Sequence, residues 1–81
     1  MASRVFAVSY SPDGKVLVTA ESRGIATLWE VGSGRKLGIV RAGGATFYSL
    51  AFSEDGLTFA TGGADGIVRL WDLAQALGPW P

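Results

Sequence analysis

The chain has 81 residues, a formal net charge of zero from seven Lys and Arg against seven Asp and Glu, and neither cysteine nor histidine. Without these two residue types it can form no disulfide scaffold, no zinc site built from Cys and His, and no Ser-His or Cys-His nucleophilic pair. Scattered bases in a neutral chain also leave no basic footprint for nucleic acid. We therefore expect no metal, no cofactor and no nucleic-acid partner.

Membrane and secretion segments are not apparent either. The longest stretch without a charged residue, 42–53, is too short to cross a bilayer. The first four residues lack the long apolar region of a signal peptide. We expect no membrane association and a cytoplasmic location.

One unit is written twice along the chain. A shift of 42 positions aligns residues 6–31 with 48–73 without a gap, and eight of the 26 aligned pairs are identical. The identities concentrate in turn residues and in one tryptophan, Trp29 and Trp71, rather than in common apolar types. Such a period indicates a repeat architecture.

Each copy predicts short strands joined by tight turns. In chain order, the expected strands are 5–11, 16–20, 25–31, 36–41, 47–53, 58–62 and 67–73. The third strand of each copy is apolar on both faces, which is typical of a strand sandwiched between two layers. Only residues 73–77 suggest a helix.

Three aspartates directly precede a glycine in the predicted turns: Asp13, Asp55 and Asp65. Aspartate is favoured there because its side chain bonds the local backbone. Acid–base catalysis needs a positioned partner in a pocket, and calcium needs six or more oxygen ligands. We interpret all three as turn residues, and we expect no enzymatic activity.

The repeated unit resembles the WD40 repeat of β-propellers. The resemblance rests on the turn Ser11-Pro12-Asp13-Gly14, on Leu28-Trp29-Glu30, and on the run from Asp65 to Asp72 that ends in Leu-Trp-Asp. It covers about residues 5–73. It implies an all-β fold of two four-stranded antiparallel blades, with 1–42 as the first blade, 43–77 as the second, and 78–81 as a Pro/Trp tail.

In this family, a tryptophan, a serine or threonine, an aspartate and a histidine form a buried hydrogen-bonded network. The resemblance implies such a network at Thr19 and Trp29 in the first copy, and at Thr61, Asp65 and Trp71 in the second. Both copies depart from the pattern, because no histidine is present and Arg23 replaces the aspartate of the first copy.

The family usually binds proteins or peptides at the top rim of the propeller. On this chain, the resemblance implies rim positions at Glu21, Arg23, Arg41, Thr46 and Phe47. The implied function is a non-catalytic interaction scaffold.

Two blades cannot close a propeller, which typically has 4–8. An isolated pair exposes apolar faces, and the missing outer strand of the second blade falls on 78–81, where two prolines disfavour pairing. We predict that the ring is completed by head-to-tail homo-oligomerisation, as a homotrimer or homotetramer. Residues 1–41 hold six bases and three acids (+3), and residues 42–81 hold one base and four acids (−3), which favours this orientation.

Other interpretations of the sequence remain open. The chain can be a fragment of a longer WD40 protein, or a designed or reconstructed repeat protein with no cellular ligand. An enzyme with its site in the central channel is disfavoured by the missing His and Cys. Trp80, between two prolines, is either a disordered tail residue or a plug that packs on the next subunit.

Overall fold

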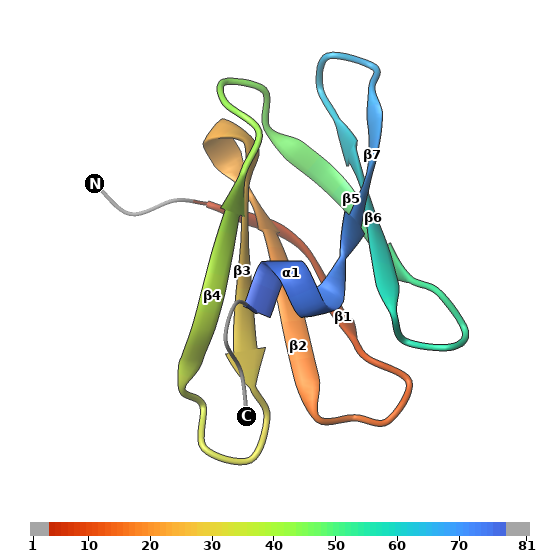
Figure 1. Ribbon diagram of the computed structural model, residues 1–81. Coiled ribbons are helices and arrows are strands. Elements are labelled where there is room, and N and C mark those ends of the chain that lie inside the picture. Colours follow the sequence, from red (N-terminus) through yellow and green to blue (C-terminus); the bar gives the residue numbers. More distant parts are fainter. Residues whose placement is uncertain (1–3, 78–81) are drawn as a thin grey trace.

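The computed structural model describes residues 4–77 and consists of two antiparallel sheets packed face to face (Figure 1). Sheet A contains, in spatial order, β1 (Val5–Tyr10), β2 (Val16–Glu21), β3 (Ile25–Glu30) and β4 (Lys36–Arg41). Sheet B contains β5 (Phe47–Phe52), β6 (Thr58–Gly63) and β7 (Val68–Asp72). A 3-10 turn, η1 (Ser22–Gly24), links β2 to β3, and α1 (Leu73–Leu77) follows β7. Among the described residues, no helix is long and apolar enough to span a membrane.

Glycine-containing turns join the first two strands of each sheet. The amide of Gly14 donates to the carbonyl of Ser11 (2.9 Å), and the amide of Gly56 donates to the carbonyl of Ser53 (3.0 Å). Both glycines have φ = 74°, a left-handed conformation that a Cβ disfavours. The turns lie where the sequence predicts them.

Each sheet also carries a bulge at the same point of its repeat. The register between β1 and β2 shifts at Phe6, and the register between β5 and β6 shifts at Tyr48. β1 and β5 lie side by side, and the two aromatic rings pack edge to face with centroids 5.0 Å apart. The bulges therefore bring equivalent side chains of the two repeats into contact.

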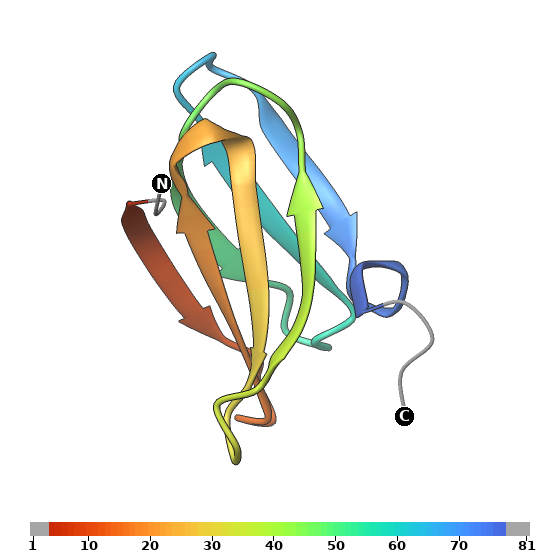
Figure 2. The same cartoon turned by 90° about the vertical axis from the view of Figure 1, so that its left-hand side faces the viewer.

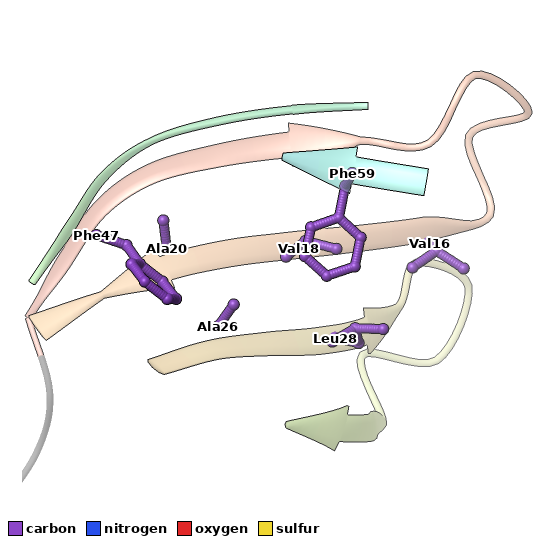
Figure 3. Packing of buried hydrophobic residues seen from close by; sticks show 7 residues of the cluster. All are labelled: Val16, Val18, Ala20, Ala26, Leu28, Phe47 and Phe59. Carbon is purple, nitrogen blue, oxygen red and sulfur yellow. The ribbon is translucent and has the colours of Figure 1, made fainter. Parts of the chain in front are cut away.

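The core lies between the inner faces of the sheets (Figure 3). Sheet A contributes small and branched side chains, and sheet B contributes Phe47 and Phe59, which are 0% and 1% exposed. Burial of each phenylalanine contributes about 1.5–3 kcal/mol. The buried hydrophobic residues are Val16, Val18, Ala20, Ala26, Leu28, Phe47 and Phe59. Such a small core is expected of so short a chain.

The third strand of sheet B is covered on one face only. The sequence predicts that the third strand of each repeat is sandwiched between layers, and β3 does bury Ala26, Thr27 and Leu28. In β7, however, Val68 and Leu70 are 70% and 77% exposed. Within residues 4–77, neither third strand is sandwiched, because no described element forms a layer outside sheet A or outside sheet B.

Within residues 4–77 sheet B has three strands, so the four-stranded expectation holds for sheet A alone. After β7 the chain forms α1, which lies between β4 and β7 (Figures 1 and 2). There the carbonyl oxygen of Ala76 would lie only 2.7 Å from a Cβ placed on Gly38 of β4. The sequence-based predictions for the tail, 78–81, concern positions outside the described residues.

Candidate functional site

A tryptophan–threonine hydrogen bond joins the second and third strands of each sheet. Trp29 Nε1 donates to Thr19 Oγ1 (3.2 Å), and Trp71 Nε1 donates to Thr61 Oγ1 (3.0 Å). The two threonines are 8% and 1% exposed, so each bond satisfies a hydroxyl that water reaches poorly. The structure brings together the tryptophans and threonines that the family resemblance implied.

In sheet A this bond continues to a carboxylate. The Thr19 hydroxyl donates to Glu21 Oε2 (2.8 Å), and Glu21 is itself buried. Glu21 therefore accepts a hydrogen bond inside sheet A and does not present its side chain on the rim. Its repeat equivalent in sheet B is Gly63, which has no side-chain acceptor, so the two networks differ.

Asp65 forms its bonds elsewhere than at the tryptophan–threonine pair of sheet B. Its Oδ1 accepts from the amide of Ile67 (3.1 Å), and its Oδ2 accepts from the guanidinium of Arg69 (3.1 Å). The hydrogen bond from Arg69 is the main cause that holds the pKa of Asp65 below its ordinary value. The carboxylate of Asp65 therefore pairs with the cation four residues further along the chain, Arg69.

The other two turn aspartates have matching partners. Ser11 Oγ donates to Asp13 Oδ1 and Ser53 Oγ donates to Asp55 Oδ1, both at 2.6 Å. The backbone amide two residues further on also donates to each carboxylate at 3.0 Å. These hydrogen bonds, the serine first, lower the pKa of both aspartates. Their acceptor atoms are thus engaged in turn formation. In the described part of the chain, no three His, Cys, Asp or Glu side chains gather into a metal-binding group.

The β4–β5 loop, η1 and the β6–β7 turn lie at the same end of the molecule, the upper end in Figure 1. The amide of Ala42 donates to the carbonyl of Gly24, and the amide of Ala64 donates to the carbonyl of Thr46, both at 2.8 Å. Gly24 has φ = 67°, and a Cβ there would lie 2.9 Å from the carbonyl oxygen of Ala45. Backbone contacts therefore tie the three connections into one rim.

The rim residues predicted from the resemblance separate into exposed and buried ones. Arg23 and Arg41 are exposed, and Thr46 is half-buried. Phe47, in contrast, is a fully buried core residue. The reason is that β5 begins at Phe47 and turns this side chain toward sheet A, whereas the next residue, Tyr48, points outward.

Sequence reasoning missed one feature beside the rim, the exposed aromatic pair Phe6 and Tyr48. These side chains are 44% and 55% exposed although they contact each other. Simple strand alternation predicts Phe6 on the same face as Val8 and Tyr10, but the bulge between Val5 and Ala7 turns the side chain of the extra residue elsewhere. The alignment of the two repeats pairs positions 6 and 48. This pairing was the one feature of the sequence that linked the two aromatic residues.

The outer face of sheet A is an open apolar surface. Figure 2 looks onto this face, and no described element lies in front of it. Val8 and Tyr10 are 57% and 60% exposed. A pocket of about 290 Å³ opens beside them. Its lining residues are Tyr10, Leu17, Thr19, Trp29, Val31 and Gly34.

The outer face of sheet B is the second open surface. Val68 and Leu70 point outward from β7, and their pairing partners in β6 are the small residues Gly62 and Ala60. Strongly exposed apolar side chains on a sheet face mark an interaction surface. Within residues 4–77, each sheet therefore buries one face against the other sheet and leaves its second face uncovered.

Comparison with known proteins identifies the repeats. The family model described as WD domain, G-beta repeat matches residues 2–30 and 35–72, most of the chain. The solved structure described as U3-55K is similar over 94% of this chain and 25% of its own, with a TM-score of 0.84 and 22% identity. A crystal structure of RRP9 WD40 repeats is similar over 94% of this chain and 24% of its own, with a TM-score of 0.85 and 22% identity. The chain thus spans about a quarter of these structures. No curated protein sequence matches it.

Proposed function

The chain belongs to the WD40 repeat family, and from this premise we propose that it is a non-catalytic interaction scaffold whose two blades are part of a closed β-propeller. Propellers bury the faces of each blade between two neighbours. A pair of blades alone cannot achieve this, so the proposal requires further blades on both sides.

The observation that carries the proposal is the pair of open sheet faces. Tyr10 on sheet A and Leu70 on sheet B are 60% and 77% exposed, although both belong to strands whose opposite faces are packed. Copies of the chain are the proposed source of the missing blades. Head-to-tail contacts close into rings when the rotation fits, so three copies form six blades and four copies form eight.

The charge distribution supports this arrangement. The half with sheet A carries +3 and the half with sheet B carries −3, by the counts above. Charges of this kind steer the orientation of association more than they add affinity. They favour contacts between unlike halves over contacts between like halves.

A longer parent chain is the second candidate source of blades. It is favoured by one observation, that the chain spans only about a quarter of the similar structures. In either case, the proposed ligand is a protein or peptide bound at the rim near Arg23, Arg41 and Thr46. In a ring of identical copies, such a site is repeated on every subunit and suits multivalent binding.

Native mass spectrometry of the 81-residue chain tests the proposal. We expect a trimer or a tetramer at micromolar concentration. A monomer at this concentration contradicts self-assembly and leaves the longer parent chain as the source of the remaining blades.

A further inference from the structure

The two open faces are repeat equivalents of the two faces that already pack together inside the chain. Subtracting 42 from the inner-face residues of sheet B leads to the outer face of sheet A, and adding 42 to the inner-face residues of sheet A leads to the outer face of sheet B. On sheet A, the outer set is Val8, Tyr10, Leu17, Thr19 and Trp29. On sheet B, the outer set is Thr58, Ala60, Gly62, Val68 and Leu70. Both halves of the internal interface are thus present a second time, without a partner among the described residues.

A leucine that is present in both repeats indicates how the two halves of the interface pack together. Leu28 on the inner face of sheet A is 0% exposed and belongs to the same core cluster as Phe59, against which Trp71 packs. Its repeat equivalent, Leu70, is 77% exposed and is the most exposed of the large hydrophobic side chains described. The same leucine is therefore a core residue in one repeat and a surface residue in the other.

A pocket that corresponds to the surroundings of the buried leucine is also present, on the outer face of sheet A. Leu17 and Trp29 are the repeat equivalents of Phe59 and Trp71, and they line the pocket of about 290 Å³ on sheet A. Tyr10, the equivalent of Phe52, forms another wall of that pocket. The pocket on sheet A thus corresponds to the aromatic surface of sheet B that packs into the core cluster containing Leu28.

We propose that Leu70 of one copy fills the pocket formed by Tyr10, Leu17 and Trp29 of a second copy. The interface between copies then repeats, residue for residue, the interface between sheets A and B. This inference rests on the proposed self-assembly and adds the two surfaces and their register. The occupant of the pocket is a second copy of this chain, because its own sheet B carries the matching face and the opposite charge.

Two blocked variants and their mixture test this inference. Leu70→Lys places a charge on the outer face of sheet B, and Tyr10→Lys places one beside the pocket of sheet A. Both positions are mostly exposed in a single chain, so each variant keeps its two-sheet fold. A charge buried at the centre of an interface raises the concentration needed for assembly by at least about tenfold.

The expected results are specific to a head-to-tail contact. Each variant alone is a monomer at the concentration at which the wild-type chain assembles. An equimolar mixture forms a one-to-one dimer, because each variant retains the face that the other lacks, and this dimer also shows that both variants are folded. The matched control is Leu57→Lys, since Leu57 is 65% exposed and its repeat equivalent is Lys15. This control assembles like the wild-type chain.

Other outcomes overturn the inference. If either blocked variant assembles like the wild-type chain, the copies use other surfaces, although the proposed ring remains. If each variant forms a dimer by itself, like faces pair and the contact is not head-to-tail. A wild-type chain that is monomeric overturns the proposed self-assembly as well, and the face on sheet A then belongs to a different partner.

Discussion

The buried tryptophan–threonine bond of sheet B allows a direct test at the scale of one hydroxyl group. Thr61 is 1% exposed and accepts the hydrogen bond from Trp71 Nε1. Thr61→Val keeps the shape of the side chain and removes the acceptor. We expect it to lower the free energy of unfolding by about 0.5–1.5 kcal/mol, because the indole N–H of the half-buried Trp71 loses its acceptor. Urea denaturation at a fixed protein concentration measures this loss.

Thr61→Ser is the matched control for this prediction. Serine retains the hydroxyl and loses only a methyl group, so it should cost less than valine. If valine is the better tolerated of the two, packing around the methyl group and not the hydrogen bond stabilises this position.

The turn aspartates predict how stability depends on pH. Hydrogen bonds from Ser11 and Ser53, followed by those from backbone amides, lower the pKa of Asp13 and Asp55 in the folded chain. A lowered pKa means that the ionised form stabilises the fold. This contribution is fully present above the unfolded value of about 3.9, and it is lost as the pH falls through the lower folded pKa.

We therefore expect the midpoint of urea unfolding to fall as the pH drops below about 4. In the double variant Ser11→Ala and Ser53→Ala, the fall should be smaller because the pKa values return toward those of the unfolded chain. An equally steep fall in the variant would assign the acid sensitivity to other carboxylates, with Asp65 as the first candidate.

Local chemistry made some of these residues predictable from the sequence. The turn aspartates follow from residue types at short, repeated spacings, whereas the threonine–tryptophan pairs were implied by the family resemblance. The hydrogen bond of Glu21 to Thr19 and that of Asp65 to Arg69 did not follow, since they depend on which group comes within reach after folding. The burial of Phe47 was missed because a shift of one residue along a strand reverses the side of the sheet.

At the scale of elements, α1 takes a course that no repeat in the sequence predicts. The strand boundaries were predicted to within one residue, because alternation and turn glycines are local signals. The helix at 73–77 was expected, but its close packing against β4 depends on Gly38. Ala76 approaches the backbone there because Gly38 has no side chain.

The substitution Gly38→Ala tests this packing of α1 against β4. The added Cβ would lie 2.7 Å from the carbonyl oxygen of Ala76, closer than a carbon and an oxygen can pack, so α1 must shift away from β4. We expect faster hydrogen exchange of the amides in 73–77, while the amides of β2 and β3 keep their protection. Gly32→Ala is the control, since nothing lies within 4 Å of a Cβ there. Equal exchange in the two variants would show that α1 is not held by its contact with β4.

At the scale of the whole molecule, a small core limits the stability of a single copy. Among residues 4–77 only seven apolar side chains are buried, while the ordering of each residue costs about 1.5 kcal/mol of conformational entropy. Repeat proteins gain stability from the interfaces between neighbouring units. If copies assemble, burial of their outer faces therefore stabilises the folded chain as well as the assembly.

This coupling predicts that the melting temperature depends on protein concentration. Self-assembly of the folded chain stabilises it by mass action, by about 1 kcal/mol per chain for each tenfold rise in concentration of a trimer or tetramer. For a domain of this size, that energy raises Tm by roughly 4–8 °C. Differential scanning calorimetry over a hundredfold concentration range measures the shift.

The Leu70→Lys variant should melt at a lower temperature that does not change with concentration, because its sheet B face cannot pair. A wild-type Tm that stays constant on dilution would mean that a single copy is stable alone, and that its outer faces contribute nothing to folding.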